Sequence, residues 1–347
     1  MENTKVTLLM SVYNGERYLR EAVESILNQT FEDFLFFIVN DGSTDGTGSI
    51  LQGYRDRRIR VVENEMNLGL TRSLNRGIEM IRSEYVARMD ADDIALPERL
   101  EKEVDFLDRH RNIGLVGTYY LRIDEKGNVV DEERPISDTV ELREKLLEGN
   151  RFAHGSVMFR KECVEKVGYY REAFQASQDY DLWLRIAEYY DMANIPEFLY
   201  KWRLNVESIS VSGKAIQDEY ASMAVELARE RRKFGRDRLQ IMDECGDGVS
   251  LVDVLKNIHC KDRKNSIRGY SYWGDIMLEK ENYNIALNLF WRAFIRDPFD
   301  RNARQGIWKV SRLSLINVIV THFPEPIVNM LKMVKRAIFS KGKGRSK

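Results

Sequence analysis

Apolar runs and amphipathic segments alternate through the first hundred residues of the chain. Four of the runs predict strands covered on both faces, at residues 6–12, 34–39, 59–62 and 85–89. Apolar residues also recur at helical spacing over 18–27 and 70–81. Strands that alternate with helices are typical of βαβ units, so this part of the chain predicts a mostly parallel sheet with flanking helices.

Unusual polar residues follow three of these strands. Tyr13 follows the first, Asp41 the second, and the acidic stretch 90–93 the fourth. In open parallel sheets, ligands bind beyond the carboxyl ends of the strands. We therefore expect these side chains to line one site at that edge of the sheet.

Beyond residue 113 the pattern is mixed. Strand-like, turn-like and helix-like segments follow one another, at residues 115–123, 125–128, 140–147, 156–159 and 181–189. From residue 214 the chain is helical in character and begins with a charged amphipathic segment at 214–234. We therefore expect an α/β domain over residues 1–213 and a helical extension over 214–347.

Residues 266–298 predict two helices joined by a turn. Seven residues of this segment follow an order that resembles a tetratricopeptide repeat: Trp273, Gly274, Tyr283, Ala286, Phe290, Ala293, Pro298. One copy is visible, and a single repeat cannot bury its own apolar face. This favours an ordinary helical hairpin packed on the first domain over a peptide-binding array.

Residues 326–347 form a basic tail. It holds seven Lys or Arg residues and no acidic residue, and its apolar residues recur at helical spacing. A basic amphipathic helix suits an anionic membrane surface. A solvated terminus without that role is an equal alternative.

Composition narrows the class of protein. Lys and Arg number 54 and Asp and Glu 55, so the net charge of -1 excludes a polyanion binder that works through bulk charge. The three cysteines show no C-x-x-C spacing, which indicates a reducing compartment without a disulfide framework or zinc knuckle. A polar start and the lack of a long apolar run predict a cytoplasmic protein whose membrane contact would be peripheral.

Carboxylates at the ends of buried strands need a partner, because burying a charge is costly. Asp90 and Asp92 form an Asp-x-Asp turn that could present two hard oxygens to Mg²⁺ or Mn²⁺. Such a cation would stabilise the charge on a departing nucleoside diphosphate. A turn and a helix N-cap, with Asp93 ahead of Pro97, would explain the same acids, so the pair alone does not decide.

Five motifs follow in order along the first domain: Ser11-Val12-Tyr13-Asn14, Val39-Asn40-Asp41-Gly42-Ser43-Thr44-Asp45, Asn67-Leu68-Gly69, Met89-Asp90-Ala91-Asp92-Asp93 and Gln178-Asp179-Tyr180-Asp181-Leu182-Trp183. Together they resemble glycosyltransferase family 2 over about residues 4–212. The resemblance implies the Rossmann-like GT-A fold and an inverting, nucleotide-sugar-dependent reaction. Gln178 and Asn205 depart from the family pattern, where Glu and His are common, and both departures concern the acceptor side.

At the reacting centre, the resemblance implies Asp179 as general base and a metal on Asp90 and Asp92. Inverting transfer needs a base for the acceptor hydroxyl while the leaving diphosphate is stabilised on the opposite side. Asp179 lies far in sequence from the other two acids, as two separate tasks require. A helix N-cap is the structural alternative for Asp179, and Asp181 is expected to be structural, a solvated acid of the first turn.

On the donor side, the resemblance implies that Tyr13 packs on the nucleotide base and that Asp41 hydrogen-bonds it. Asp90 would lie near the ribose and the metal, and Arg203 near the diphosphate. Arg72 and Arg88 could neutralise the same diphosphate, with structural salt bridges as the alternative.

Three residues are candidates for the acceptor side: His154, Trp183 and Trp202. His154 precedes a short strand and could face the acceptor or the metal, or be an ordinary structural histidine. The two tryptophans could form the wall of an acceptor cleft or belong to the core.

The sequence therefore predicts a metal-dependent, inverting glycosyltransferase that uses Mg²⁺ or Mn²⁺ and a UDP-sugar. The acceptor would be a hydroxyl of a growing, lipid-linked surface glycan at the inner face of a membrane, and no nucleic acid is expected. A sugar nucleotidyltransferase would need a Gly-rich loop after the first strand, where Tyr13-Asn14-Gly15 offers one Gly. A nucleotide-binding scaffold that works through the helical region is the alternative from another class.

Overall fold

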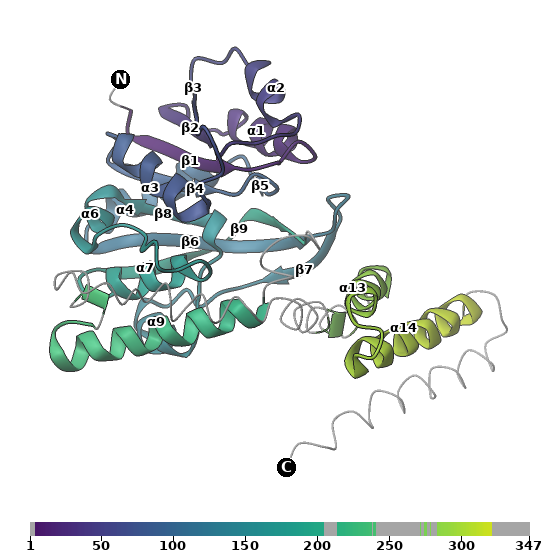
Figure 1. Cartoon of the computed structure of the whole chain (residues 1–347). Helices are drawn as coiled ribbons and strands as arrows, with labels where there is room; N and C mark the ends of the chain where they lie inside the picture. Colours follow the sequence, from purple (N-terminus) through teal and green to yellow (C-terminus); the bar gives the residue numbers. More distant parts are fainter. Residues whose placement is uncertain are drawn as a thin grey trace. The chain divides into compact units, whose positions relative to one another are not determined.

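The computed structural model describes residues 4–204, 214–237, 239–240 and 283–320, with four positions between 271 and 278. The chain divides into two compact units (Figure 1). One contains the sheet and most of helix α9, and the other contains helices α13 and α14.

Within the described residues the first unit is built on one mixed sheet of nine strands. The strands are β1 Val6–Val12, β2 Phe34–Asn40, β3 Ile59–Glu63, β4 Tyr85–Met89, β5 Ile94–Ala95, β6 Ile113–Ile123, β7 Val129–Glu133, β8 Met158–Arg160 and β9 Asp191–Arg203. Their order is β3-β2-β1-β4-β8-β6-β9-β5, and β7 pairs with β6 outside this path. Strands β3, β2, β1 and β4 are parallel, so their carboxyl ends meet at one edge.

Helices cover both faces of this sheet. Those of the first unit are α1 Leu19–Leu27, α2 Thr47–Gln52, α3 Leu70–Met80, α4 Arg99–Arg109, α5 Thr139–Lys145, α6 Lys161–Val167, α7 Gln178–Ile186 and α9 Lys214–Phe234, with the short 3-10 turns η1 Leu146–Glu148 and η2 His154–Ser156. The fold expected from the sequence, a Rossmann-like sheet with flanking helices, is confirmed.

The two faces of the sheet carry separate apolar cores, because successive side chains of a strand point to opposite faces. In β1, Leu8 and Met10 face the core under α1 and α4, whereas Leu9 faces the core shared with α3, α7 and α9. Gly77 of α3 is required at this crossing, since a Cβ there would lie 2.5 Å from a methyl carbon of Leu9. Burying one such side chain contributes about 1.5–3 kcal/mol to the free energy of unfolding.

The first four predicted strands and the helix at 214–234 are confirmed, and the differences elsewhere are local. The predicted strand at 156–159 begins two residues later, because His154–Ser156 turns as η2 before β8. The predicted helix at 181–189 begins three residues earlier, at Gln178, and ends at Ile186. Its earlier start places Asp179 in the first turn.

Helix α9 packs on the first unit, although its sequence belongs to the predicted extension. Tyr220, Ala224 and Leu227 are fully buried in the same core as Trp183 of α7. Residue 213 therefore marks a change in the character of the sequence. That it is also a domain boundary stays a prediction.

The second unit contains α13 Tyr283–Arg296 and α14 Arg301–Val320. The ring of Phe290 in α13 packs against Gly274 and Gly306, where a Cβ would collide with it. Ala286, Ala293 and Ala303 are fully buried beside it, so small residues let the helices approach closely. The predicted hairpin over 266–298 lies partly outside the described residues. The basic tail lies wholly outside them.

Candidate active site

The loops after β1 and β2 hold each other at the carboxyl edge of the sheet. The backbone N–H of Asn14 donates to Ser43 Oγ at 3.0 Å, and the N–H of Thr44 donates to Asn14 Oδ1 at 2.8 Å. Gly15 N–H also donates to Thr47 Oγ1 at 2.9 Å. Tyr13, beside this junction, keeps 49% of its surface exposed, so its ring is available to a ligand at this edge.

Asp41 lies at the end of β2 and organises the loop that leads into α3. Its carboxylate accepts hydrogen bonds from Asn64 Nδ2 at 2.6 Å, from Leu68 N–H at 2.9 Å and from Gly69 N–H at 3.0 Å. A carboxylate has about four acceptor positions, so these bonds occupy most of them. With 2% of its surface exposed, Asp41 acts first as the anchor of this loop, and its contact with a nucleotide base stays a prediction.

The acidic turn after β4 is built around a buried arginine. Arg88 is 1% exposed, and its Nη2 donates to Asp90 Oδ1 at 2.6 Å. Burial by itself raises the pKa of Asp90, but the Arg88 guanidinium, together with the other charged groups around the turn, holds the pKa below its usual value. Arg88 was a candidate for the diphosphate, and in this structure it supports Asp90 instead.

The last acid of this turn, Asp93, is fully buried. Tyr200 of β9 donates its hydroxyl to Asp93 Oδ2 at 2.6 Å, and the N–H of Arg203 donates to Asp93 Oδ1 at 2.7 Å. Burial raises the pKa of Asp93 well above its usual value, and the charges of Asp92 and Asp90 raise it further. The alternative that Asp93 caps a helix is wrong, because the residue preceding α4 is Glu98 and Asp93 bonds to β9.

Arg203 clamps the same turn from the end of β9. It is 1% exposed, and its Nε donates to the carbonyl oxygen of Asp92 at 2.7 Å. Its remaining nitrogens donate to the carbonyl oxygens of Asp124 and Glu125 and to the carboxylate of Glu21. Arg203 was expected near the diphosphate, and here all of its nitrogens serve the fold.

The turn η2 brings His154 against the acidic turn. A Cβ on Gly155 would lie 2.9 Å from Asp90 Oδ2 and still nearer to the hydroxyl of Tyr200, so only glycine fits between them. His154 Nε2 lies 2.9 Å from the Tyr170 hydroxyl. Burial first, and then the charge of Arg88, lower the pKa of His154 to about 3, so its imidazole is neutral at pH 7.

Asp179 stands in the first turn of α7. Its Oδ2 accepts a hydrogen bond from Asn150 Nδ2 at 2.8 Å. Ser177, just before the helix, has a left-handed backbone with φ of 52°, and its hydroxyl donates to the carbonyl oxygen of Gln217 on α9 at 2.9 Å. A left-handed non-glycine residue is held by its surroundings, here by α9, and it sets the direction in which α7 starts.

Asp179 and Asp90 come from motifs almost ninety residues apart and share one electrostatic environment. Burial raises the pKa of Asp179 to about 6, and the charge of Asp90 adds to the rise, while hydrogen bonds from Tyr180 N–H and Asn150 oppose it. The charges of both acids also act on Tyr170. The structure thus brings together Arg88, Asp90, His154 and Asp179.

Asp181, two residues further along α7, has a different environment. It is fully buried, and its carboxylate is 2.9 Å from Arg185 and 3.6 Å from Arg171. Asp181 was expected to be structural, and that is confirmed, but the expectation that it is solvated is wrong. Asp181 therefore forms a buried ion pair on the same helix whose first turn carries Asp179.

The same ion-pair group continues to α9. Asp237 is fully buried and pairs with Arg171 at 2.8 Å and with Arg231 at 2.5 Å. Arg231 also pairs with Glu188, beyond the end of α7, at 2.6 Å. Breaking one member of a buried ion pair is strongly destabilising, so this group fixes α9 to α7.

The other candidates lie at the margins of the site or in the core. Trp183 is fully buried and packs edge-on against Phe152 and His154, so the interpretation of its indole as a core side chain is the one that holds. Trp202 is half-buried and packs edge-on against Tyr120. Arg72 is exposed and pairs with Glu172 at 2.7 Å, a salt bridge at the surface.

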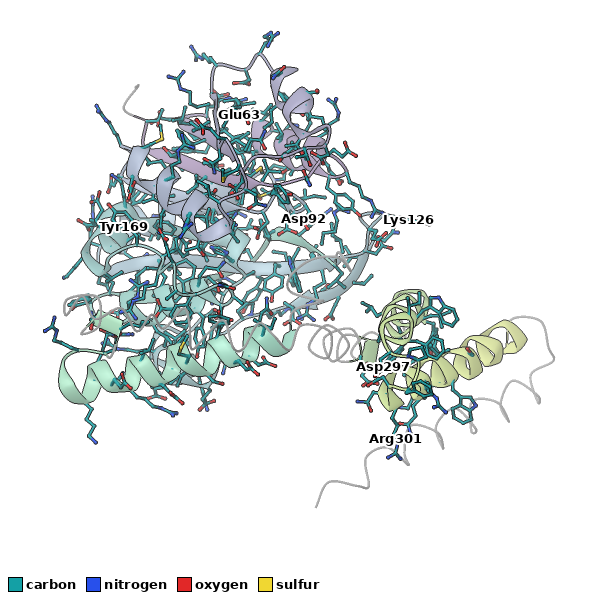
Figure 2. All side chains as sticks on the ribbon, viewed as in Figure 1. Glu63, Asp92, Lys126, Tyr169, Asp297 and Arg301 are labelled. Atoms are coloured by element: carbon teal, nitrogen blue, oxygen red, sulfur yellow. The ribbon has the colours of Figure 1, made fainter. Side chains whose placement is uncertain are left out.

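The acidic turn has the donors that a hard cation prefers. Asp90 is about one-third exposed at 32%, Asp92 is half-buried in the same turn, and three carboxyl groups crowd within four residues. Figure 2 marks Asp92 on the turn that follows β4. Among the described residues, no three His, Cys, Asp or Glu side chains could hold a metal by themselves. A cation here would therefore need oxygen ligands from a diphosphate and water as well.

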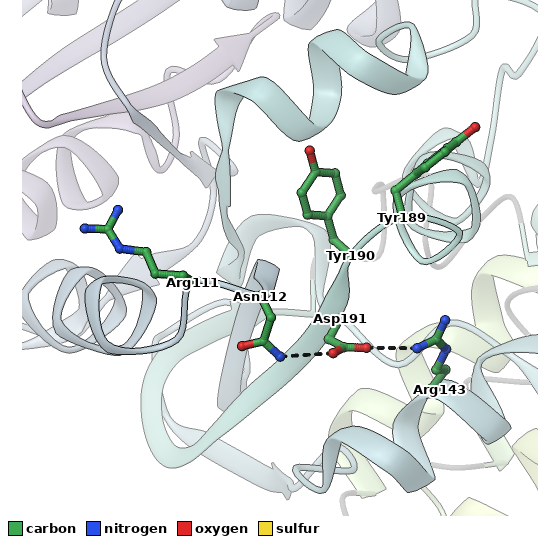
Figure 3. A pocket seen from close by; sticks show the side chains of 6 residues that line it. All are labelled: Arg111, Asn112, Arg143, Tyr189, Tyr190 and Asp191. Carbon is green, nitrogen blue, oxygen red and sulfur yellow. Dashed lines mark hydrogen bonds and ion pairs between the residues drawn. The ribbon is translucent and has the colours of Figure 1, made fainter.

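A separate pocket of about 340 Å³ lies where strands β6 and β9 begin, at the ends of these strands away from the acidic turn. Asp191 begins β9 there and accepts hydrogen bonds from Asn112 at 3.0 Å and from Arg143 at 3.0 Å, as Figure 3 shows. These polar groups are paired with one another, and the pocket contains none of the predicted site residues.

Sequence reasoning missed three residues of the site: Asn150, Tyr170 and Tyr200. Asn150 binds Asp179, Tyr170 binds His154, and Tyr200 binds Asp93. None stands in a motif, because each belongs to a segment that only the folded chain brings to the acids.

Comparison with known proteins identifies the family. Residues 7–168 match the model of "Glycosyl transferase family 2". A relative named glycosyltransferase EpsE, from Bacillus subtilis, is 38% identical over 271 residues, which are 76% of this chain and 96% of that protein. The chain belongs to glycosyltransferase family 2. It is an enzyme of the glycosyltransferase class.

Another relative in the family is the amylovoran biosynthesis glycosyltransferase AmsE from Erwinia amylovora. It is 31% identical over 265 residues, which are 74% of this chain and 99% of AmsE. An O-antigen biosynthesis glycosyltransferase of Escherichia coli, WbnJ, is 32% identical over 215 residues, or 60% of this chain and 84% of WbnJ.

Among solved structures, S. aureus TarS 1-349 in complex with UDP-GlcNAc matches with a TM-score of 0.53 and 16% identity. The match covers 89% of this chain and 92% of that one, and it supports the GT-A fold. In the part of the chain that the structure describes, no helix is both long and apolar enough to cross a membrane.

Proposed function

We propose that this glycosyltransferase moves a sugar from a nucleotide-sugar to a hydroxyl of a glycan, with inversion at the reacting carbon. The observation that supports this most is that the acidic turn and helix α7 meet at η2, where Gly155 lies against Asp90 and His154 packs on Trp183 of α7. The catalytic domain is assigned to residues 1–213 and the helical extension to 214–347.

In this proposal Asp179 is the general base. Its pKa of about 6 keeps the carboxylate charged at neutral pH, yet close enough to that pH to accept a proton efficiently. As the acceptor oxygen attacks the anomeric carbon, its proton passes to Asp179, and the bond to the diphosphate breaks on the opposite face. Asn150 keeps the carboxylate in place during this transfer through its bond to Oδ2.

Asp90 and Asp92 would hold a divalent cation, either Mg²⁺ or Mn²⁺. Carboxylate oxygens in one turn match what these cations prefer, and a cation would offset the charges of Asp90 and Asp92 that raise the pKa of Asp93. When bound, the cation would neutralise charge on the leaving diphosphate. Arg88 and Arg203 keep the turn in shape, one on the side chain of Asp90 and the other on the carbonyl of Asp92.

The favoured donor is a UDP-sugar. The solved structure of similar fold carries UDP-GlcNAc, and the exposed ring of Tyr13 offers a stacking surface beside the loop that Asp41 anchors. Arg72, on the exposed face of α3, would have to leave Glu172 before it could approach the diphosphate. His154 and Trp202 are assigned to the acceptor side.

The favoured acceptor is a hydroxyl of a growing surface polysaccharide that is carried on a lipid. Two relatives are named for amylovoran and O-antigen biosynthesis. A basic tail over 326–347 would then hold the enzyme at the anionic inner face of a membrane. If removing the residues after 325 leaves membrane partitioning unchanged, the tail has no such role.

The proposal is tested by release of UDP from a panel of UDP-sugars with Mg²⁺ or Mn²⁺. We expect turnover by the full chain, lost in Asp92→Ala and kept in Asp105→Ala, a matched change of an exposed acid on α4. Nucleotide binding without turnover with any donor or acceptor would favour a scaffold. Metal-dependent turnover unchanged in Asp92→Ala would contradict the assignment of the metal.

A further inference from the structure

Ser177, the residue before helix α7, differs from an ordinary N-cap in two ways. Its backbone is left-handed, with φ of 52° and ψ of 26°, which is uncommon for a residue other than glycine. A serine at this position usually accepts a hydrogen bond from a backbone N–H of the first turn. Within α7, all of which the structure describes, the Ser177 hydroxyl caps no N–H. Something outside α7 must therefore hold this residue.

Helix α9 is what holds Ser177. The Ser177 hydroxyl donates to the carbonyl oxygen of Gln217 at 2.9 Å, so the side chain that could cap α7 is tied to another helix. The carbonyl oxygen of Ser177 still accepts a helical bond, from the N–H of Asp181 at 3.2 Å. A strained backbone persists only where its surroundings hold it, and the bond to α9 accounts for the left-handed start of α7.

Helices α7 and α9 lie on the same face of the sheet and meet near both ends of α7 (Figure 1). Ahead of α7, the ring of Phe174 lies 5.8 Å from the ring of Tyr220 on α9. Beyond α7, Glu188 pairs with Arg231 of α9 at 2.6 Å. The tie at Ser177 is therefore part of an extended contact, and α9 is a firm support for the start of α7.

The position of Asp179 depends on how α7 starts. Asp179 stands two residues after Ser177, and its Oδ2 accepts a hydrogen bond from Asn150 Nδ2 at 2.8 Å. Asn150 lies in a separate segment between η1 and η2, so this bond forms only if the first turn points toward that segment. Misplacing a reacting group by about 1 Å can lower a rate by about 100-fold. The direction of the first turn is thus a feature on which proton transfer would depend.

We propose that Ser177 is a positioning residue, through which α9 sets the direction of the first turn of α7 and so the place of the Asp179 carboxylate. The inference rests on the proposed function, in which Asp179 is the general base. It adds that the reaction depends on α9, a helix of the predicted extension in which none of the candidate site residues lies.

The test compares two variants of the full chain that both accept a left-handed backbone, since glycine and asparagine adopt it more readily than other residues. Ser177→Asn keeps a donor for the carbonyl oxygen of Gln217, whereas Ser177→Gly has none. Ser83→Ala is the matched control. The Ser83 hydroxyl also joins two segments, since it donates to Thr7 Oγ1 at 2.9 Å, but it lies ahead of β4, at the amino edge of the sheet.

Turnover is measured as UDP release at saturating acceptor, and nucleotide binding as the Kd for UDP with Mn²⁺. We expect kcat to fall at least about tenfold in Ser177→Gly with an unchanged Kd, and to stay within about threefold in Ser177→Asn and Ser83→Ala. In an Asp179→Asn background, Ser177→Gly should lower kcat no further, because both changes act through one carboxylate.

Three kinetic outcomes would overturn the positioning role. The first is a kcat of Ser177→Gly within about twofold of the unchanged chain. The second is an equal loss in Ser177→Asn, because restoring the donor would then not restore the rate. The third is a full further loss on adding Ser177→Gly to Asp179→Asn, because Ser177 would then act by another route.

Hydrogen exchange gives a readout that needs no turnover. The N–H of Asp181, which bonds to the Ser177 carbonyl, should exchange at least about tenfold faster in Ser177→Gly than in the unchanged chain or Ser83→Ala. Equal exchange would overturn the role of α9. If the unchanged chain turns over no UDP-sugar, or if Asp179→Asn keeps full kcat, the proposed function fails, and the exchange rates still decide whether α9 holds the first turn.

Discussion

The acidic turn after β4 and the first turn of α7 both contain closely spaced aspartates. They differ in the partners that surround the buried one. Both place acids one or two residues apart, and in both one acid is fully buried. In α7 the buried acid, Asp181, is paired with Arg185 and Arg171. In the acidic turn the buried acid, Asp93, has neutral donors, a tyrosine hydroxyl and a backbone N–H.

This difference favours a neutral Asp93 and a charged Asp181. In the acidic turn Arg88 pairs with Asp90, and three carboxyl groups lie within four residues. The α7 pair is compensated below Asp179, so that Asp179 is the acid left to face the site. A turn that gathers several carboxyl oxygens suits a cation, and an acid of raised pKa suits a base.

The largest expected effect comes from removing the base. Asp179→Asn keeps the shape of the side chain and cannot accept the proton, so we expect kcat to fall at least about 100-fold. Release of UDP with a saturating acceptor measures this. The cap alternative is wrong, because Ser177 is the N-cap of α7. A kcat within a few-fold of the unchanged enzyme would show that Asp179 is a structural acid of the first turn and not the base.

Removing the compensated acid should act on stability instead. Asp181→Asn leaves Arg185 buried without its counter-charge, while Arg171 keeps its pair with Asp237, so we expect the free energy of unfolding to fall by about 3 kcal/mol. Urea unfolding followed by circular dichroism measures it. An unchanged midpoint would mean that this ion-pair group does not hold α7.

The same change at the two positions should shift stability in opposite directions. The pKa of Asp179 is about 6 in the folded chain against an ordinary 3.8, so its charge costs stability fully above pH 6 and less as the pH falls toward 3.8. Asp179→Asn should therefore melt at a higher temperature than the unchanged chain at pH 7.5, and the two should converge near pH 4. A melt of Asp179→Asn that is lower at pH 7.5 would contradict this sign.

The smallest expected effect concerns the acid limb of activity. The value of kcat/KM should decline below about pH 6, as Asp179 gains a proton and ceases to act as base. Asn150→Ala removes a hydrogen bond that favours the charged form, so the limb should move to higher pH. Asn112→Ala, in the separate pocket, is the matched control and should leave the limb in place.

Much of the fold could be predicted from the sequence. The parallel strands have continuous apolar runs because both of their faces are covered, and the polar residues follow where the strands leave the core. That is why Tyr13, Asp41 and Asp90 fall at one edge. The positions of η2 and of the start of α7 were less certain in sequence, because they depend on Gly155 at the acidic turn and on Ser177 bound to α9.

The roles of charged side chains were harder to predict than their positions. Arg88 and Arg203 looked like diphosphate ligands, and both are buried supports of the acidic turn. Trp183 looked like either core or cleft wall, and it is core. An arginine motif is the same in sequence whether its guanidinium meets a ligand or a carbonyl oxygen of the chain.

The sequence by itself determined the order of strands and helices, the family and the edge of the sheet where the acids gather, because hydrophobic period and motif order are local properties. The tertiary structure alone decided which acids are compensated and which arginines are buried. Burial and charge pairing depend on side chains that meet from distant parts of the chain, as Asn150 meets Asp179 and Tyr200 meets Asp93.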